Sequence, residues 1–521
     1  MPIRMVEDEN QQNSENENND EQYTPPQEQD VNTGGGGFDS RWLLGIPLLF
    51  KLFKGRMIWL IILAIVGYFL YSKFSGLGAS DSSSDIGRGC EMKQEEYDKA
   101  EVYEPLDVQK NGIPASASLS QYCPPAKNQG QQGSCVGWGS SYAARTILEA
   151  TATGQDPRNV AFSPAYLYNQ IGLGGCQGAY INKAMEVLTR QGDLPYNQFP
   201  YDQNSCDQMP NQQQVASAGQ YKMKGYNRLT LSGEDYRNDI NSVKQHLAAG
   251  APVVVGMFVT ESFTQGMMGR KVWHPTSYDY DGPNLGGHCM CVIGYDDNLE
   301  GGAFQLANSW GPEWGENGKG WVKYKDFLHF TQEAYGTYPM GVVKANDKKL
   351  SAVLGLVNVD TKQYISLMNA GGNLFRTTSA IKKGQKFKME IKNNTECYVY
   401  VFGQETDNSS YVLFPYTKKH SPYCGITGSR LFPKDHSMQA DNIGNKDYMA
   451  VVVSKTPLDY NKLNGIVNSS GQSNYQMKFN DAFKNTALQN VRFGVSNGNA
   501  AFECDVAEKK AVVAIVEINK Q

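Results

Sequence analysis

The sequence lacks the cysteine patterns of a metal centre or of a small disulfide-rich domain. Its ten cysteines are scattered over 521 residues, which is too sparse for a disulfide framework. No pair of Cys-x-x-Cys motifs is present, so a structural zinc site is not expected. Cys289 and Cys291 lie one residue apart in an apolar stretch, where buried free thiols are the common case. We therefore expect no metal and no cofactor.

A basic surface is missing as well. The formal net charge is −5, and no Lys/Arg stripe follows the chain, which argues against a nucleic-acid partner. Residues 1–30 hold nine acidic residues and one basic residue, Arg4, among many Asn and Gln. Such a stretch buries too little apolar surface to offset chain entropy. We expect a disordered acidic tail over residues 1–40, which ends in the flexible Gly34–Gly37 run.

Long apolar runs are rare, and Met57–Tyr71 is the longest uninterrupted one. It falls short of the roughly 20 residues that cross a bilayer core, but Arg56 and Lys73 flank it and can reach the interfaces. A buried core helix would be amphipathic, and a signal peptide would begin near the N-terminus. We therefore expect one transmembrane helix, at about 57–71, within a membrane segment over residues 41–74.

More basic residues precede this run than follow it. The four before it are Arg41, Lys51, Lys54 and Arg56, and the two after it are Lys73 and Arg88. The positive-inside bias predicts a single-pass protein with a cytoplasmic N-terminus and everything after Tyr71 outside the cytoplasm. Residues 42–53 either lie along the membrane interface or form a re-entrant turn.

Cys135 is the strongest candidate for a nucleophile. A turn-rich segment with Gly130 and Gly133 precedes it, and residues 136–149 have apolar side chains at helical spacing. Cys135 is thus expected at a helix N-terminus, with Ser134 as the cap. Unpaired amides and the helix dipole there favour a thiolate, which lowers the thiol pKa from about 8.5 toward neutrality.

Among the six histidines, His288 is the best partner for this cysteine. It follows a glycine turn and begins a short apolar strand, which favours a position in a cleft, whereas His246 is expected to be a solvated helix residue. Asn308 lies twenty residues further along, and Trp310 is close enough to cover a polar pair. An Asn oxygen that accepts from the imidazole would fix its tautomer and leave the other nitrogen to face sulfur.

Gln129, Cys135, His288 and the Asn308-Ser-Trp310 sequence together resemble the papain family of cysteine peptidases in order and spacing. The resemblance covers residues 112–346. It implies an α+β domain with a helical half, a β-barrel-like half and the site between them.

The resemblance also implies a role for each residue. Cys135 attacks the peptide carbonyl, His288 exchanges protons, and Asn308 orients His288. The Gln129 amide and the Cys135 backbone N–H form the oxyanion hole. Gly178 and Trp310 are expected beside the substrate, and Trp314 on its leaving-group side.

The sequence departs from the family pattern near the cleft. Val136 replaces a tryptophan, and Ala179 replaces a usual second glycine. Gln132 stands where a disulfide cysteine is frequent, which leaves Cys176 either paired with Cys206 or free. Residues 75–111 are expected to be a linker. The forty residues Ser72–Asn111 are too few for a long helical propeptide, so we expect no self-inhibition by a prodomain.

The chain after residue 350 has a β-rich pattern. It resembles an uncharacterised bacterial domain, and we expect an antiparallel β-sandwich over residues 350–521 that binds a protein or a surface. The expected strands are Lys386–Ile391, Cys397–Phe402, Tyr411–Phe414, Met449–Val453 and Ala511–Ile518.

These expectations combine into a membrane-tethered cysteine peptidase that acts on peptides or proteins outside the cytoplasm, as at a bacterial inner membrane facing the periplasm. Two alternatives stay open. One is an acyl transferase that uses the same thioester chemistry with an amine acceptor. The other is a catalytically silent papain-like scaffold used for binding.

Overall fold

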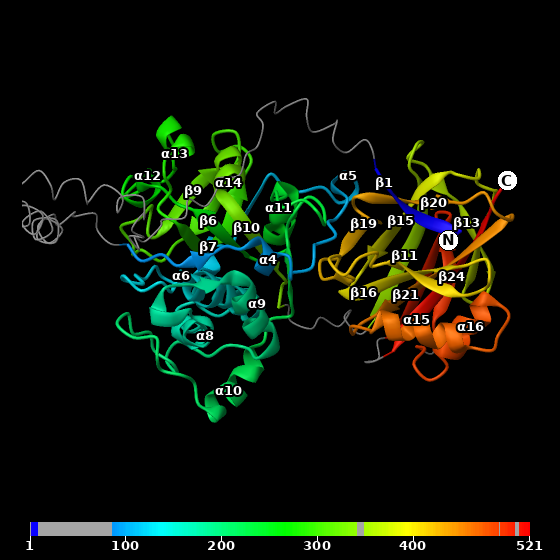
Figure 1. The fold of residues 1–521 in the computed structure, drawn as a ribbon, viewed down its shortest axis with the longest axis horizontal. Helices are drawn as coiled ribbons and strands as arrows, with labels where there is room; N and C mark the ends of the chain where they lie inside the picture. The colour runs from blue at the N-terminus through cyan, green and yellow to red at the C-terminus, as the bar shows by residue number, and fades with distance from the viewer. Residues whose placement is uncertain (1, 9–85, 341–348, 489, 506–509) are drawn as a thin grey trace, which may run out of the picture. The chain divides into compact units, whose positions relative to one another are not determined.

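The computed structural model describes residues 2–8, 86–340, 349–488, 490–505 and 510–521. The predicted membrane segment 41–74, its helix 57–71 and most of the acidic tail lie outside these residues. In the part of the chain that is described, no helix is long and apolar enough to cross a membrane. Residues 86–340 form one domain with a helical and a β-rich half, and residues 349–521 form a β domain (Figure 1).

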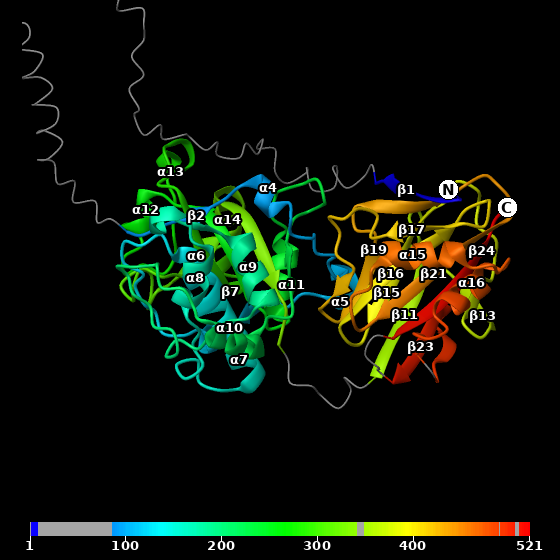
Figure 2. The same ribbon diagram turned by 60° about the horizontal axis from the view of Figure 1, so that its bottom comes forward.

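The first domain begins its helical half at Cys135. The helices of residues 86–340 are α4 (Gln94–Tyr97), α5 (Val108–Asn111), α6 (Cys135–Gly137), the π-helix Trp138–Arg145, α7 (Thr146–Thr153), α8 (Pro164–Ile171), α9 (Ile181–Arg190), α10 (Gln212–Ala218), α11 (Ile240–Ala248), α12 (Glu261–Thr264), α13 (Ser277–Asp281) and α14 (Tyr324–Phe330). The run from α6 to α7 confirms the predicted helix and is buried from Cys135 to Leu148. It packs against α8 and α9 (Figure 2).

The β-rich half of this domain is a sheet with strand order β5-β10-β6-β7-β8-β9, with β3 beside β7. Its strands are β3 (Ser116–Ser118), β5 (Tyr226–Arg228), β6 (Val253–Phe258), β7 (Gly287–Asp296), β8 (Ala303–Ala307), β9 (Lys319–Lys323) and β10 (Thr331–Thr337). All its pairings are antiparallel. His288 therefore begins β7, and Asn308 directly follows the neighbouring strand β8.

The β domain consists of two sheets that share one apolar core. The first contains β11 (Lys349–Asn358), β12 (Tyr364–Ile365), β15 (Lys386–Asn393), β19 (Gly428–Phe432), β20 (His436–Ala440), β22 (Arg492–Ser496) and β23 (Asn499–Asp505). The second contains β13 (Leu367–Gly371), β14 (Leu374–Thr377), β16 (Cys397–Gln404), β17 (Ser410–Phe414), β18 (Tyr423–Cys424), β21 (Lys446–Ser454) and β24 (Ala511–Asn519). Each of the five predicted strands lies within one of these.

Two features of the β domain differ from the prediction. The strands β14 and β24 pair in parallel, whereas an antiparallel sandwich was expected. Two helices, α15 (Tyr460–Ser469) and α16 (Tyr475–Ala482), pack against the outer face of the second sheet. Their apolar side chains cover that face, so the sheet is buried on both sides. Figure 2 shows the two helices lying over the second sheet.

The expected disorder of residues 1–40 is wrong for the first few residues. Strand β1 (Ile3–Glu7) pairs antiparallel with β20 at the edge of the first sheet. Ile3 is 1% exposed and belongs to the core between the sheets, and Asp8 forms an ion pair with Lys388 at 2.6 Å. The overall acidity of the tail concealed this short apolar-polar alternation.

Because Ile3 fills part of this core, Ile3→Ala should destabilise the β domain by about 2 kcal/mol, since a cavity remains where the side chain packed. Calorimetry of the full chain should show a lower melting temperature for one transition. Glu7→Ala, at an exposed position of the same strand, is the matched control. Equal melting temperatures for the Ile3→Ala variant and the unmodified chain would contradict the docking of β1.

Candidate active site

His288 and Asn308 form a direct hydrogen bond between two neighbouring strands. Nε2 of His288 lies 2.7 Å from Oδ1 of Asn308, and the same oxygen accepts from the backbone N–H of Ser309 at 2.7 Å. An amide oxygen is an acceptor, so His288 carries its proton on Nε2. Nδ1 is buried without a hydrogen-bond partner among the described residues, which leaves its lone pair unused.

Trp310 covers this pair, as the sequence predicted. Its ring stacks on His288 with centroids 4.1 Å apart and an interplanar angle of 22°. Trp314 is fully buried and donates from Nε1 to the carbonyl of Phe263 at 2.8 Å. It packs edge to face against Trp310, so it supports the covering tryptophan and offers no surface of its own to a ligand.

Cys135 begins helix α6, but Ser134 is not its side-chain cap. The Ser134 hydroxyl instead lies 2.7 Å from the Tyr201 hydroxyl, and Tyr201 donates to the main-chain carbonyl of Gln129 at 2.7 Å. One phenol thus connects the residue before Cys135 to the main chain of Gln129.

The Gln129 side chain is held by bonds at both ends of its amide. Its Oε1 accepts from Ser309 Oγ at 2.6 Å, and its Nε2 donates to the carbonyl of Gln132 at 2.9 Å. The backbone N–H of Gln129 also donates to the carbonyl of Ser309 at 2.9 Å. Ser309 therefore fixes the orientation of Gln129, and the second N–H of this amide stays available.

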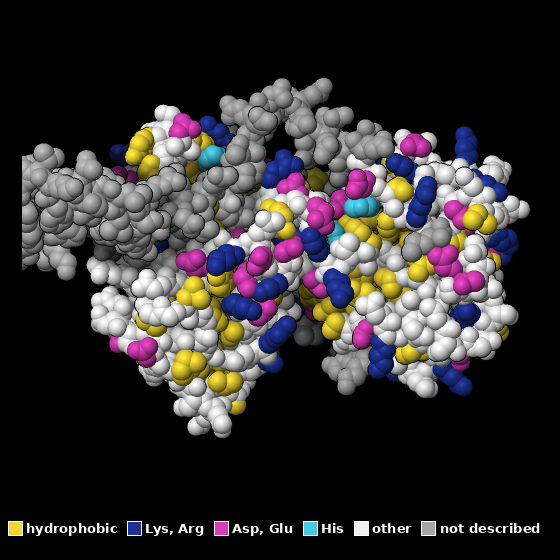
Figure 3. Space-filling model, in the orientation of Figure 1, with side chains coloured by type: hydrophobic (Ala, Val, Ile, Leu, Met, Phe, Trp, Pro, Cys, Tyr) yellow, Lys and Arg dark blue, Asp and Glu magenta, His cyan; other side chains and the backbone are white. Residues whose placement is uncertain are grey.

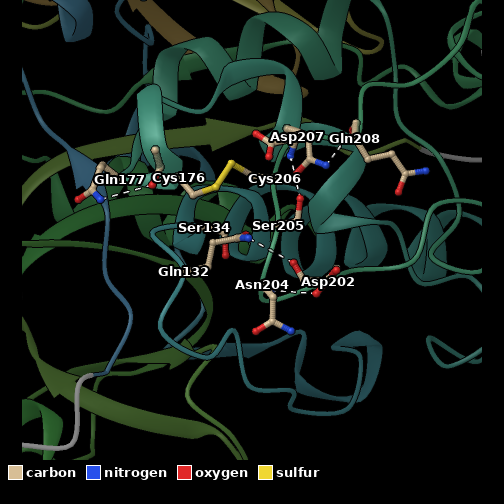
Figure 4. Close-up of a disulfide and its surroundings, with 12 residues drawn as sticks. Gln132, Ser134, Cys176, Gln177, Asp202, Asn204, Ser205, Cys206, Asp207 and Gln208 are labelled. Carbon is tan, nitrogen blue, oxygen red and sulfur yellow. Dashed lines mark hydrogen bonds between the residues drawn. A yellow bond between two sulfur atoms is a disulfide. The ribbon is translucent and has the colours of Figure 1, made fainter.

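A disulfide shapes the loop beside Cys135. Cys176 pairs with Cys206, which settles the alternative left open by the sequence in favour of the bond. Figure 4 shows it next to Gln132 and Ser134. The carbonyl of Cys176 accepts from the backbone N–H of Gly133 at 3.0 Å. The disulfide thus anchors the turn that leads to Cys135.

Residues 87–92 of the chain itself occupy the space in front of Cys135. Strand β2 (Cys90–Glu91) pairs in parallel with β4 (Ala179–Tyr180), and the carbonyl of Gly89 accepts from the N–H of Ala179 at 2.9 Å. On the opposite side, the N–H of Gly89 donates to the carbonyl of Gly287 at 3.4 Å. We call residues 87–92 the occluding segment.

The occluding segment fits because glycines face each other at close range. Gly89 has φ of +129°, and a side-chain carbon there would collide with the carbonyl of Gly133. Gly178 has φ of +158°, and a side-chain carbon there would lie 2.7 Å from the carbonyl of Gly89. Glycine is the residue that permits such approach. Gly178 therefore lies beside an extended segment of the protein's own chain, and its predicted contact with a substrate stays a prediction.

Further contacts hold both ends of the occluding segment. The carbonyl of Gly87 accepts from Trp310 Nε1 at 2.9 Å, and its N–H donates to the carbonyl of Gly130 at 3.1 Å. At the other end, the main chain of Lys93 hydrogen-bonds to the carboxyl of Glu333. Burial raises the pKa of Glu333 to about 8, so this carboxyl is protonated at neutral pH.

The occluding segment changes the protonation expected for the Cys135 thiol and the His288 imidazole. Cys135 and His288 are both 0% exposed. Burial raises the pKa of Cys135 well above its usual value, and hydrogen bonds from the main chain of Cys289 and Val136 oppose this only in part. Burial also lowers the pKa of His288 to about 3, against the effect of the Asn308 bond. The predicted thiolate is therefore wrong for the covered site, where the neutral thiol and neutral imidazole are favoured.

Two other sequence interpretations need correction. The predicted linker 75–111 contains β2, α4 and α5 from residue 90 onward. The expectation of no self-inhibition by a prodomain stays a prediction, and the six residues 87–92 that cover the site are a feature that the sequence interpretation did not foresee. His246 is fully buried, with Nδ1 2.7 Å from the carbonyl of Thr337, because β10 covers its helix.

Sequence reasoning missed Tyr201, Ser309 and the occluding segment as parts of the site. The Gly87-Arg-Gly-Cys90 run was the available signal, since two glycines in three residues suit close main-chain contact. Ala179 is buried and pairs with Cys90, so its extra methyl group does not obstruct the segment.

Lys/Arg and Asp/Glu side chains both occur among the described residues on the face that Figure 3 shows. The described residues also contain no group of three or more His, Cys, Asp or Glu arranged to hold a metal ion.

Part of the first domain is similar to a known protein family. The model of the papain family cysteine proteases matches residues 114–338, which confirms the resemblance for this part of the chain. A domain of unknown function, DUF4384, matches residues 380–457.

Individual relatives are similar to less than half of the chain. An uncharacterized peptidase C1-like protein of Acanthamoeba polyphaga mimivirus is 29% identical over 208 residues, which are 38% of this chain and 64% of the relative. Cathepsin K of Mus musculus is 28% identical over 221 residues, 42% of this chain and 58% of the relative. The chain thus spans less than two thirds of the length of these relatives.

The solved structures that align with the chain have lower sequence identities to it than these relatives. Xylellain, a cysteine protease from Xylella fastidiosa, is 24% identical with a TM-score of 0.41, and the alignment covers 50% of this chain and 97% of xylellain. Digestive procathepsin L 3 of Tenebrio molitor is 20% identical with a TM-score of 0.37, over 58% of this chain and 99% of that one.

The close fit of the occluding segment predicts that Gly89→Ala exposes Cys135. A side chain at this φ is strained by about 1–3 kcal/mol and collides with Gly133, so the segment should leave the cleft more often. The exposed thiol loses its burial penalty and its pKa falls. Alkylation of Cys135 by iodoacetamide at pH 7, followed by mass spectrometry, should be about tenfold faster.

The control is Glu95→Ala, which alters an exposed residue in the first turn of α4. Its alkylation rate should equal that of the unmodified chain. A Gly89→Ala variant that reacts no faster than this control would contradict the occlusion of Cys135 by residues 87–92.

Proposed function

We propose that this chain, whose residues 114–338 match papain family cysteine proteases, hydrolyses peptide bonds with Cys135 as nucleophile. The observation that carries the proposal is the His288–Asn308 hydrogen bond of 2.7 Å. It places the proton of His288 on Nε2 and leaves Nδ1 free for proton exchange with sulfur. A silent binding scaffold would not require this bond, nor the fixed amide of Gln129.

The reaction begins when Nδ1 of His288 takes the thiol proton and Cys135 attacks the peptide carbonyl carbon. The oxygen then carries negative charge and accepts hydrogen bonds from the Gln129 amide and the Cys135 backbone N–H. His288 passes the proton to the leaving nitrogen, the C–N bond breaks, and an acyl thioester to Cys135 remains.

Water completes the cycle. His288 takes a proton from a water molecule that attacks the thioester carbonyl, and the oxyanion hole again holds the charged oxygen. The C–S bond breaks, the acid product leaves, and Cys135 regains its proton. Asn308 keeps the ring in one orientation throughout, with Trp310 shielding their bond from water.

A substrate needs the space that the occluding segment fills. The backbone of Ala179 and Gly287 bonds to Gly89, and these are main-chain groups that an extended peptide would use. Hydrolysis therefore requires residues 87–92 to leave. Release lets water reach Cys135 and His288, which lowers the pKa of the thiol, raises that of the imidazole and favours their charged forms.

We also propose that residues 41–74 attach the chain to a membrane, with the peptidase domain on the non-cytoplasmic side. The pairing of β1 with β20 adds a constraint, because it requires Ile3–Glu7 and the β domain to lie on the same side of the membrane. A single crossing of the membrane by residues 57–71 would place them on opposite sides. An apolar segment that enters the membrane and returns to the same side is compatible with the pairing.

Substitutions at Cys135, Gln129 and Asn308 should reduce hydrolysis to different extents, because the proposed roles are nucleophile, oxyanion donor and orientation of His288. Cys135→Ala should abolish hydrolysis of a fluorogenic peptide, because no nucleophile remains. Gln129→Ala should lower kcat by about 100- to 1000-fold through loss of one oxyanion donor. Asn308→Ala should reduce kcat less than Cys135→Ala, since it removes only the orientation of His288. Circular dichroism checks that each variant is folded.

The outcome that would contradict hydrolysis is transfer of the acyl group. If an added amine takes most of the acyl product and little free acid forms, the chain is an acyl transferase. If no variant differs from the unmodified chain after release of the occluding segment, the roles assigned to these residues are wrong.

Membrane topology can be tested in bacterial spheroplasts that express the full chain. An epitope inserted among residues 9–30 and another at the C-terminus should both be removed by added protease, as the β1–β20 pairing requires. Loss of the C-terminal epitope alone would indicate a single crossing, as the basic residues predict. Recovery of the chain in the soluble fraction after lysis would contradict membrane attachment.

A further inference from the structure

We propose that Cys90 and Cys289 form a redox modification site, where a disulfide between the two thiols fastens the occluding segment in the cleft. Its regulatory consequence rests on the proposed peptidase function. The bond itself does not, because it depends only on where the two thiols lie.

The thiols of Cys90 and Cys289 both lie beside the paired strands β6 and β7. Cys289 lies opposite Gly256 in the antiparallel pairing of β6 and β7, and opposite side chains in such a pair lie about 4.5–5.5 Å apart. Sγ of Cys90 lies 3.2 Å from the place where a side-chain carbon of Gly256 would be. The sulfur of Cys90 therefore occupies the space that Gly256 leaves beside Cys289. Burial raises the pKa of the Cys90 thiol, and the neighbouring Cys289 raises it further.

The main chains approach closely enough for a bridge. The hydrogen bond from Gly89 to Gly287 joins the residue before Cys90 to a residue two positions before Cys289. Neighbouring extended segments lie about 4.8 Å apart, and the Cα atoms of a disulfide lie about 4.4–6.8 Å apart. A bond between the two thiols requires both side chains to rotate.

Other cysteines nearby are placed differently. Cys291 lies two residues further along β7, opposite Val254, and the thiol that influences it is Cys123 rather than Cys90. Cys135 is influenced by Cys90 electrostatically, without a hydrogen bond between the two side chains. The pairing of Cys90 with Cys289 is therefore the one that the contacts favour.

The bond forms by exchange with a small disulfide such as oxidised glutathione. When the segment swings out, the exposed Cys90 loses its proton, attacks one glutathione sulfur and expels the other as a thiolate. On return of the segment, the Cys289 thiolate attacks the Cys90 sulfur and expels the second glutathione. The protein loses two protons and two electrons, and two reduced glutathiones form.

The Cys176–Cys206 disulfide supports an oxidising setting for this domain, since such bonds persist where the surroundings are oxidising. In that setting the Cys90–Cys289 bond would keep Cys135 covered. A reductant would cleave it and return the segment to its hydrogen-bonded, reversible docking. The site thus links access to Cys135 with the thiol–disulfide balance around the protein.

The test uses the full chain, incubated with oxidised glutathione or with dithiothreitol. After digestion without reductant, mass spectrometry should find a peptide that joins Cys90 to Cys289 only in the oxidised sample. Alkylation of Cys135 should be at least about tenfold slower in that sample than in the reduced one. A bridge from Cys90 to Cys135, or no bridge from Cys90, would overturn the proposal.

Two variants complete the test. Cys90→Ser should make the alkylation rate of Cys135 independent of oxidation, whereas Cys291→Ser, the matched buried cysteine on β7, should keep the full response. Loss of the response in both would overturn the pairing. A bridge in a chain that hydrolyses no peptide when reduced would refute the proposed function alone, and hydrolysis without a bridge would refute this site alone.

Discussion

Main-chain contact between the occluding segment and both sides of the cleft governs the chemistry of the site. Gly89 bonds to Ala179 on the helical half and to Gly287 on the β-rich half, so one residue bridges the two walls. Water is excluded from Cys135 and His288 as a result, and exclusion of water disfavours both the thiolate and the imidazolium. The strands therefore determine where the side chains of the candidate site lie. The occluding segment separately determines their protonation.

The positions of His288 and Asn308 were predictable because local patterns determine them. A glycine turn before an apolar strand places His288 at the start of β7, and the end of the adjacent strand places Asn308 beside it. The five strands predicted for the β domain follow from period-2 alternation and β-branched residues. In each case, a few neighbouring residues determine the position, and the antiparallel register then brings distant residues together.

The errors share a physical cause, which is burial by a part of the chain remote in sequence. His246 has a helical pattern that suggests a solvated residue, yet the carbonyl of Thr337 on β10 lies 2.7 Å from its ring. The pKa of Cys135 depends on residues more than forty positions earlier, and Ile3 is buried by strands that follow it by hundreds of residues. No window of the sequence contains both members of these contacts, so local reasoning cannot supply them.

Glycine and cysteine act together in the covered site. Gly256 and Gly287 leave the space in which Cys90 and Met92 lie, since side-chain carbons there would meet their sulfur atoms or main chain. Space made for docking thereby brings Cys90 within reach of Cys289. Gly256 and Gly287 thus allow the occluding segment to dock, and the same two glycines bring the thiol of Cys90 close to that of Cys289.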